Sequence, residues 1–371
     1  MRIGILTFHY TINPGSVLQA YCLQKILMRK HPNAVVEIIN LIPYNRELNE
    51  LISLRRRIPF IDYESILKYV SIRKFVNDNL ILSKKALHRN IDKQIDFINS
   101  LNYDYIITGS DTVFMYSPKL DNMLPSIYYL PKGVKSNKIS FAASLDPLKD
   151  RYVFKKNKSI LKSIFDEYSI VTVRDTITYE ILNDIGVNNI KYIADPTILY
   201  DFEKDFNINT SISNIVKKQN IVIWTGSREL NDKLKVIIDD SNGATISVKP
   251  KVNYHSHNYI CDYLSSYKDI DVLITDRYHK SIFALKLSNA LVINIERNDK
   301  NIIDKGKGWD LFNRIGINEY FIRYDGNNVE YFKSKLINTI NDWDEQALNK
   351  RNEMVNKYIV NQKAILDNIY F

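Results

Sequence analysis

The chain has 371 residues and a mass of 43.4 kDa, too long for one ordinary domain, so we expect two domains. Hydrophobic residues make up 45% of the chain, enough for sizeable cores, but no apolar run approaches the roughly 18 residues that a membrane-spanning helix needs. The net charge of +9 is able to attract nucleic acid, an anionic membrane or an anionic substrate.

Two features of the sequence indicate a reducing compartment. The opening "MRIGILTFHY" resembles a short strand and lacks the long apolar region of a secretory signal. The cysteines, Cys22 and Cys261, are far apart, so neither a disulfide framework nor a structural zinc site is expected. We therefore expect a cytoplasmic protein without a metal site or a bound cofactor.

Most basic residues are dispersed, and the densest cluster is "LRRRIPF" at 54–60. Such a cluster is either a solvated loop or helix end, or a surface that binds anionic lipid headgroups. Peripheral association with the inner face of the membrane is therefore an alternative to a purely cytoplasmic location. No nucleic-acid partner is expected.

Strand-like and helix-like segments alternate along the chain, which predicts parallel sheets flanked by helices. The first strand is predicted at "RIGILTF", and a helix over 16–30 follows the turn residues Asn13, Pro14 and Gly15. The segment "AVVEIINL" predicts the second strand.

Residues 46–100 are predicted to form a mostly helical insertion in the first domain, which spans 1–205. Buried strands follow at "YDYIITGSD", "NKISFAASL" and "YSIVTVRD", with a helix over 175–185 after the third. The segment "NNIKYIADPTIL" completes this half of the chain.

A second alternating set is predicted in the second domain, 206–342, after a polar boundary stretch. Its strands are predicted at "NIVIWTG", "GATISVK", "DVLITD" and "NALVINI", with helices near 229–240, 258–268 and 278–287. Residues 343–371 are predicted as one long helix that crosses back to the first domain. Doubly wound sheets bind ligands at the carboxyl ends of their strands, so we expect a cleft between the two domains.

The strongest local signal is "LITDRYHKSIFALK", where an apolar strand becomes a helix. The first N–H groups of a helix are unpaired and lie at its positive end, so a guanidinium and an imidazole there form a site for phosphate or carboxylate. Arg277, His279 and Lys280 are the candidates, and His279 is also able to transfer a proton. The alternative is a surface Arg277 that pairs with Asp276 beside a capping histidine.

Two other predicted strands end in polar residues. Arg174 is either the partner of Asp175 or Asp195, or a second guanidinium directed at the cleft. Ser110 and Asp111 follow another strand, and Asp111 is either a helix cap or a group that faces the ligand.

Histidines and glycines elsewhere give weaker signals. His9, near the end of the first strand, is either a structural core histidine or part of the site, and Gln19 lies in the helix that follows. His255 and His257 lack a carboxylate or cysteine at ligand spacing, so a loop is a better interpretation than a metal site. The glycine-rich "KGKGW", 305–309, is predicted as a loop that lacks the full spacing of a phosphate-binding motif.

Taken in order, these segments resemble the motifs of the polysaccharide pyruvyltransferase family. The resemblance extends from residue 3 to about 316. The motifs are "NPGSVLQAY" (13–21), "TGSD" (108–111), "FAAS" (141–144), "VRD" (173–175), "DPT" (195–197) and "DRYHKSIFAL" (276–285).

The resemblance implies an α/β fold of two Rossmann-like, doubly wound domains in a glycosyltransferase-B-like arrangement. It also implies transfer of a pyruvyl group from phosphoenolpyruvate to a hydroxyl pair of a sugar, free or lipid-linked. That reaction forms a pyruvate ketal and releases phosphate in the synthesis of an exopolysaccharide or cell-wall glycan. Carried over by position, Arg174, Arg277 and His279 serve the donor.

In this reaction we expect His279 to act as a general acid at the leaving phosphate and Asp111 to draw a proton from the acceptor. The expected cleft or acceptor residues are His9, Asn13, Gly15, Gln19, Ser110 and Lys280.

The chain departs from the family pattern in two places. Thr112 and Phe114 stand where the family usually has Gln and Trp, and Lys280 stands where it usually has Gly or another small residue. Two alternative functions remain open, a glycosyltransferase that uses a nucleotide sugar and a non-catalytic partner in glycan assembly.

Overall fold

The computed structural model describes residues 1–44, 48, 52, 63–117, 124–145, 147–206, 208, 216, 218–239, 244–250, 252, 258–297, 306–324 and 328–369. The chain divides into two compact units. Unit 1 comprises Met1–Tyr200, Tyr254–Ile260 and Ile369–Phe371, and unit 2 comprises Asp201–Asn253 and Cys261–Asn368.

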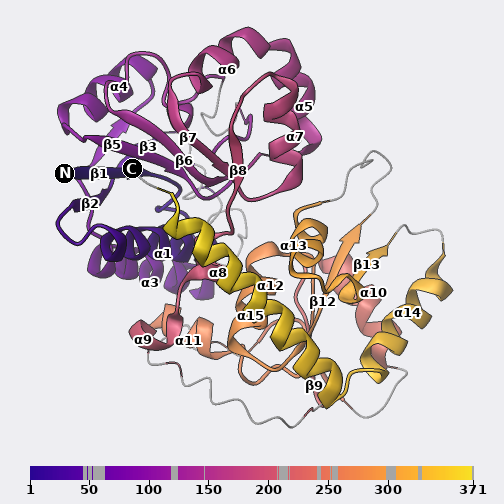
Figure 1. Ribbon diagram of the computed structural model, residues 1–371. Helices are drawn as coiled ribbons and strands as arrows, with labels where there is room; N and C mark the ends of the chain where they lie inside the picture. The colour runs from indigo at the N-terminus through magenta and orange to yellow at the C-terminus, as the bar shows by residue number, and fades with distance from the viewer. Residues whose placement is uncertain are drawn as a thin grey trace. The chain divides into compact units, whose positions relative to one another are not determined.

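Unit 1 is built on a sheet whose strand order is β2-β1-β5-β6-β7-β8 within the described residues (Figure 1). Every neighbouring pair runs parallel. The strands are β1 (Arg2–Leu6), β2 (Val35–Ile38), β5 (Tyr105–Gly109), β6 (Asn137–Ala143), β7 (Tyr168–Val173) and β8 (Ile190–Tyr192). Their apolar side chains are mostly buried, as expected for a parallel sheet that is covered on both faces.

Helices cover both faces of this sheet. Figure 1 shows α1 (Pro14–Lys30) and α3 (Tyr63–Asn79) on one side and α4 (Ile91–Ser100) and α6 (Lys158–Phe165) on the other. The other helical elements of this unit are η2 (Ile127–Tyr129), α5 (Pro147–Lys156), α7 (Thr176–Asp184) and α8 (Pro196–Leu199). The helix α1 starts two residues earlier than predicted because Pro14 suits the first helical position and Asn13 caps it.

A small second sheet pairs β3 (Leu41–Pro43) in parallel with β4 (Ala86–His88). The sequence predicted a single strand over "AVVEIINL", but the chain leaves the main sheet after Ile38. It does so because the N–H of Leu41 bonds to the carbonyl of Ile39, which turns the backbone away. The strand β4 lies in a region that was predicted to be mostly helical.

Unit 2 contains a second parallel sheet, with the order β10-β9-β11-β12-β13 among the described residues. The strands are β9 (Asn220–Ile223), β10 (Thr245–Ser247), β11 (Val272–Thr275), β12 (Leu291–Arg297) and β13 (Phe321–Tyr324). The helical elements in this part of the chain are α9 (Phe202–Phe206), α10 (Arg228–Asp239), α11 (Tyr259–Ser265), α12 (Tyr278–Leu287), α13 (Lys307–Ile315), η3 (Asn318–Tyr320), α14 (Val329–Asn341) and α15 (Glu345–Asp367). The predicted α/β class with doubly wound parallel sheets is confirmed, whereas the glycosyltransferase-B-like arrangement stays a prediction.

The loop predicted at 305–309 is wrong for its second half, because α13 begins at Lys307. Leu311, Phe312 and Ile315 repeat at helical spacing and are buried, which favours the helix. The basic cluster 54–60, His255, His257 and Lys305 lie outside the described residues.

Both sheets reverse their winding at one place. In unit 1 the chain passes from β1 to β2 on one side of β1 and later returns to place β5 on the other side. In unit 2 the same reversal occurs at β9, between β10 and β11. The carboxyl ends of the two strands at such a switch point frame the usual ligand site of a doubly wound sheet.

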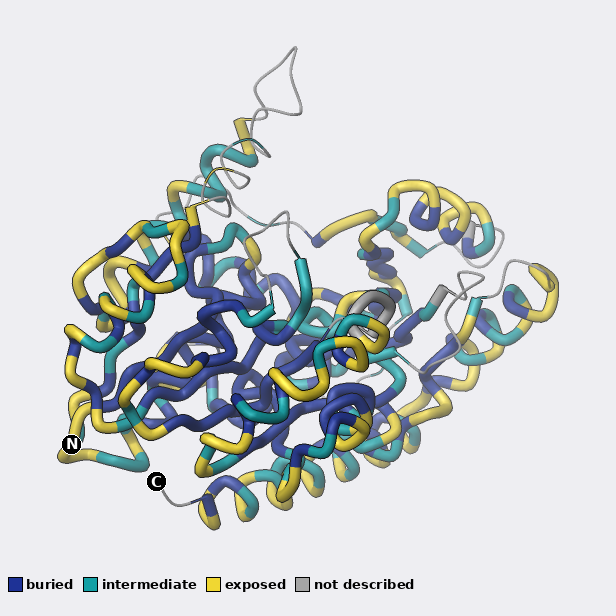
Figure 2. The backbone as a smooth tube through the Cα atoms, turned by 90° about the horizontal axis from the view of Figure 1, so that it is seen from above, coloured by how far each residue is buried: buried dark blue, intermediate teal, exposed yellow. Residues whose placement is uncertain are grey.

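The strands form the buried interior, which Figure 2 shows in dark blue, while the outer sides of the helices are exposed. Among the described helices, none is both long enough and apolar enough to cross a membrane.

Gly109, at the end of β5, has a φ of +130°, and a Cβ there would lie 2.0 Å from the main-chain oxygen of Phe141. We expect Gly109→Ala to lower the free energy of unfolding by about 3 kcal/mol or more, because both the backbone conformation and a main-chain contact oppose a side chain. Denaturant unfolding followed by circular dichroism measures the change.

Gly133→Ala is the matched control. Gly133 also has a positive φ, +102°, but the nearest atom to a Cβ there would be Cγ2 of Ile95 at 3.4 Å. The control is expected to lose only about 1 kcal/mol. Equal losses in the two variants would contradict the steric explanation.

Candidate functional site

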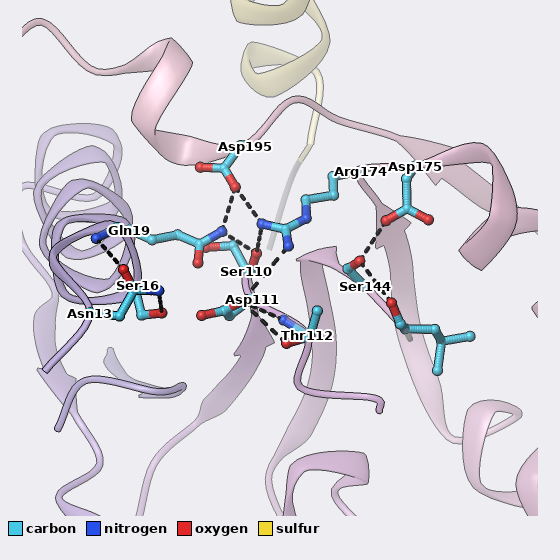
Figure 3. A network of polar contacts seen from close by, with 12 residues as sticks. Asn13, Ser16, Gln19, Ser110, Asp111, Thr112, Ser144, Arg174, Asp175 and Asp195 are labelled. Atoms are coloured by element: carbon cyan, nitrogen blue, oxygen red, sulfur yellow. Dashed lines mark hydrogen bonds and ion pairs between the residues drawn. The ribbon is translucent and has the colours of Figure 1, made fainter. Parts of the chain in front are cut away.

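Arg174 lies at the carboxyl edge of the first sheet and joins the ends of two strands (Figure 3). Its side chain is only 3% exposed, and its Nη1 donates to Oδ2 of Asp195 at 2.6 Å and to the main-chain oxygen of Ser110 at 3.0 Å. Its Nη2 lies 3.7 Å from Oδ1 of Asp111. Of the alternatives that the sequence left open, the pairing of Arg174 with Asp195 is confirmed.

Gln19 contacts the same two acceptors as Arg174. From α1, its Nε2 donates to the main-chain oxygen of Ser110 and to the Asp195 carboxylate. The other carboxylate oxygen of Asp195 accepts from the N–H and the hydroxyl of Thr197, at 3.0 and 2.6 Å, and so caps α8. The buried charge of Asp195 is therefore compensated on both oxygens, as a buried carboxylate requires.

Asp111 follows the turn at the end of β5, and its side chain is 10% exposed. Its Oδ1 accepts the N–H of Thr112 at 2.7 Å. The expectation of a helix cap here is wrong, because the described residues 111–117 form turns and a bridge but no helix. Asp111 thus places a carboxylate beside the Arg174 guanidinium at the switch point of unit 1.

Oγ of Ser110 and Oε1 of Gln19 are among the buried polar atoms that have no hydrogen-bond partner within the described residues. Both side chains are fully buried. Because nearly all buried polar groups in proteins are hydrogen-bonded, these two atoms have unused hydrogen-bonding capacity.

The start of α1 lies beside these residues (Figure 3). Oδ1 of Asn13 accepts the N–H of Gly15 at 3.1 Å, and its Nδ2 donates to Oγ of Ser16 at 3.2 Å. The first turn of α1 contains no acidic residue, so its positive end is not neutralised from within the helix.

His9 is 1% exposed and both ring nitrogens have partners. Nδ1 lies 3.2 Å from the carbonyl oxygen of Thr7, and Nε2 lies 3.1 Å from Oδ1 of Asn40. The interpretation of His9 as a structural core histidine is therefore favoured.

The switch point of unit 2 brings Arg277 against the loop after β9. Arg277 occupies the N-cap position of α12, and its side chain is 55% exposed. Its Nε lies 3.2 Å from Oδ1 of Asp276, which also accepts the N–H of Gly226 at 2.8 Å. The guanidinium lies so close over Gly226 that a Cβ there would be 1.4 Å from its Nη2.

His279 lies in the first turn of α12, where two aromatic rings fix its imidazole. The ring stacks on Phe283, one turn further along the helix, with centroids 6.2 Å apart and planes 22° apart. Tyr278 contacts it edge-on at 5.4 Å. The residue as a whole is partly buried, and the Nε2 atom of its ring is buried.

Lys280 is held by Trp224, which follows β9. Its Nζ donates to the main-chain oxygen of Trp224 at 3.2 Å and lies 3.8 Å from the centre of the indole ring. This cation–π contact keeps the ammonium charge at the first turn of α12. The departure of Lys280 from the family pattern therefore adds a fixed cation to this edge.

The opposite end of α12 is held by Arg351 of α15. This guanidinium is 2% exposed and donates to the carbonyl oxygens of Leu285 and Ser288, at 3.4 and 3.1 Å. Burial lowers the pKa of Arg351 to about 10. A cation on the last carbonyls stabilises the helix that has Arg277 at its N-cap and His279 in its first turn.

The first turn of α12 contains no acidic residue. The N–H groups at the start of this helix, the guanidinium of Arg277, the imidazole of His279 and the ammonium of Lys280 form an arrangement suited to phosphate or carboxylate. Among the described residues, no group of three or more His, Cys, Asp and Glu side chains has the arrangement of a metal site.

The structure thus brings together Gln19, Ser110, Asp111 and Arg174 in unit 1, and separately Arg277, His279 and Lys280 in unit 2. The sequence offered Asp195 only as an alternative partner of Arg174, and it did not predict Trp224 and Gly226 as parts of these sites. Trp224 and Gly226 lie at the end of the predicted strand "NIVIWTG", and their place at a strand end was the signal available for finding them.

The two parallel sheets, with polar and cationic side chains at their switch points, define a doubly wound α/β protein. The family model of the polysaccharide pyruvyl transferases matches residues 13–288. The chain belongs to this family, and the resemblance seen in its motifs is confirmed.

Solved structures of low sequence identity are also similar to the chain. A protein assigned as a UDP-N-acetylglucosamine 2-epimerase from Listeria monocytogenes is 11% identical, with a TM-score of 0.49, over 95% of this chain and 90% of the other. A spinosyn rhamnosyltransferase is 10% identical, with a TM-score of 0.44, over 100% of both chains. A glycosyltransferase from a Streptomyces species is 10% identical, with a TM-score of 0.41, over 97% of this chain and 96% of the other. Among curated proteins, none matches the sequence.

Asp195→Ala is expected to lower the free energy of unfolding by about 3–5 kcal/mol, because it leaves the buried Arg174 charge without its close partner. Asp78→Ala is the control, since it breaks a pair with Lys74 in which both side chains are more than 50% exposed. The control is expected to change stability by less than about 1 kcal/mol. Denaturant unfolding compares the two, and a small loss for Asp195→Ala would refute a structural role for the pair.

Proposed function

We propose that this protein transfers the pyruvyl group of phosphoenolpyruvate to two hydroxyls of a sugar in the synthesis of a surface polysaccharide. Membership of the polysaccharide pyruvyl transferase family supports a transferase of this class. The observation that carries the choice of donor is the group of Arg277, His279 and Lys280 at the first turn of α12.

Phosphoenolpyruvate carries a phosphate and a carboxylate on the same carbon atom, so its site needs more than one cation. The guanidinium of Arg277 is able to bind either the phosphate or the carboxylate. Lys280 and the N–H groups at the start of α12 are able to bind the group that Arg277 does not. The predicted donor contact of Arg174 stays a prediction, since in this structure its guanidinium binds Asp195 and Ser110.

The reaction begins with a proton added to the enol methylene, which leaves an oxocarbenium-like carbon. One acceptor hydroxyl adds to this carbon and loses its proton. The carbon–oxygen bond to phosphate then breaks as His279 donates a proton to the leaving oxygen, and the second hydroxyl closes the ketal and loses its proton. The two hydroxyl protons balance those gained by the methyl group and the phosphate.

We assign the base at the acceptor to Asp111, whose carboxylate is held beside Arg174. The unpartnered Oγ of Ser110 and Oε1 of Gln19 are the proposed contacts for acceptor hydroxyls. The acceptor is a glycan, free or lipid-linked, and the reaction takes place in the cytoplasm or at the inner face of the membrane.

Purified protein with phosphoenolpyruvate and a panel of galactosyl and N-acetylmannosaminyl acceptors is expected to release phosphate and yield a ketal detectable by mass spectrometry.

Arg277→Ala should raise KM for phosphoenolpyruvate by about 100-fold, since it removes charge-assisted hydrogen bonds. His279→Gln should lower kcat by about 10²–10⁴-fold with a smaller effect on KM, because it removes the acid.

Lys268→Ala, an exposed change in the same unit, should leave both constants unchanged. The proposal fails if no acceptor supports phosphate release. Thermal protection by nucleotides but not by phosphoenolpyruvate would instead favour a glycosyltransferase. A glycan product that persists in cells carrying Arg277→Ala and His279→Ala would favour a non-catalytic role.

Gly226→Ala tests the position of Arg277 without changing its charge. The new Cβ displaces the far end of a flexible side chain, so the fold should persist while the guanidinium leaves its place. We expect phosphoenolpyruvate affinity, measured by calorimetry, to fall by at least about tenfold. Unchanged affinity would show that Arg277 does not bind the donor from this position.

A further inference from the structure

A second candidate binding site lies in unit 1, among the helices between β6 and β8. It is a cavity of about 450 Å³ lined by Arg151, Phe154, Lys155, Lys158, Ile181, Asp184 and Ile185. These residues come from α5, the start of α6, α7 and the residue after α7. Figure 1 shows these three helices together, and α5 packs against both α6 and α7.

The cavity has an apolar floor and a basic rim. Phe154, Ile181 and Ile185 are almost completely buried, with exposed fractions of 0%, 1% and 2%. Arg151, Lys155 and Lys158 are exposed. A ligand that fits such a cavity has an anionic head and an aliphatic part, and the volume is in the usual range for small-ligand pockets.

The positive charge at the rim is only partly neutralised. Arg151 pairs with Glu180 at 3.0 Å, but both side chains are about half exposed, so the pair is weak. Nζ of Lys158 donates to the main-chain oxygen of Asp184 at 3.2 Å, and no ion pair of Lys158 is found within the described part of the chain. Among the side chains that the structure describes, no carboxylate forms an ion pair with Lys155.

Apolar side chains project from the same helices. Tyr152 of α5 is 75% exposed and Ile160 of α6 is 51% exposed. Lys155 and Lys156 lie three and four residues after Tyr152, so they share its side of the helix. Exposed aromatic and aliphatic side chains between lysines are typical of a surface that enters the headgroup region of a membrane.

We propose that this cavity binds the phosphate of an anionic phospholipid, and that α5 and the start of α6 dock unit 1 on a membrane surface. The rim cations contact the phosphate, the apolar floor receives the first part of the acyl chain, and Tyr152 and Ile160 enter the interface. The proposal does not depend on the identity of the sugar acceptor or on the proposed reaction.

A membrane explains the surface better than a nucleic acid does. Both carry phosphates, and single-stranded nucleic acids also stack their bases on exposed aromatic rings, of which Tyr152 is one on this surface. The floor here is formed by two isoleucines and a buried phenylalanine, and Ile160 offers no surface for stacking. The aliphatic side chains of this cavity, which lie beside basic residues, fit the acyl chain and the phosphate of a phospholipid better than they fit a nucleic acid.

Flotation of the purified full-length protein with vesicles tests the proposal. Vesicles of phosphatidylcholine with 30 mol% (about one lipid in three) phosphatidylglycerol should bind the protein, and pure phosphatidylcholine vesicles should not. The double variant Lys155→Glu/Lys158→Glu should weaken binding by at least about 25-fold, since each basic residue near an anionic surface contributes about fivefold. Binding should also fall steeply in about 0.5 M salt, because this ionic strength, which is above the physiological one, screens the attraction between exposed charges more strongly.

Lys132→Glu/Lys135→Glu is the matched control, because it makes the same change of charge at exposed positions of unit 1 outside the cavity. Circular dichroism confirms that each variant is folded. If the control weakens binding as much as the cavity variant, the attraction comes from net charge and the proposed site is wrong.

A second readout reports on insertion. Tyr152→Trp should shift its emission to shorter wavelength on anionic vesicles, and Ile160→Asp should weaken binding although it leaves the cavity rim intact. Equal thermal protection by inorganic phosphate and by phosphatidylglycerol vesicles would assign the cavity to a soluble phosphate compound instead. Binding to polyuridylate without binding to anionic vesicles would assign it to nucleic acid, and either result overturns the proposal.

Discussion

The parallel arrangement of all strands within each sheet is the constraint on which the rest of this structure depends. Because parallel strands present their carboxyl ends at one edge, polar residues that are distant in the sequence meet there. The reversal of winding then selects one gap along that edge, between β1 and β5 in unit 1 and between β9 and β11 in unit 2. Ser110 and Asp111 lie at the first gap and Gly226, Asp276 and Arg277 at the second.

The arginines at the two sheet edges differ in burial. In unit 1 the Arg174 guanidinium is buried and balanced by carboxylates, so it stabilises the turn after β5 and holds Asp111 in place. In unit 2 the Arg277 guanidinium pairs through Nε with Asp276 but is 55% exposed, and the Lys280 ammonium lies on the Trp224 ring, so solvent and an anion are able to reach the Arg277 charge. A buried charge requires a partner in the protein, whereas an exposed one is free to exchange water for a ligand.

Much of the fold followed from local pattern. The helix over 278–287 was predicted with its observed bounds, and the strands around β5, β7 and β11 were found because they are rich in apolar and β-branched residues. The pattern failed at β3, β4 and α13. Short strands of three residues carry little periodicity, and the glycines at the start of α13 resemble a loop although its apolar face is buried. The helices α5 and α6, which line the proposed membrane site, were also missed.

The sequence by itself determined the α/β class, the family and which strand ends carry Arg174, Arg277 and His279, because alternation of segments and short motifs are local properties. Only the tertiary structure decided that Arg174 pairs with Asp195 and that Lys280 lies on Trp224. Those contacts join residues 21 and 56 positions apart. They depend on strand order and on which buried polar groups need partners, and neither is encoded in the spacing of a single segment.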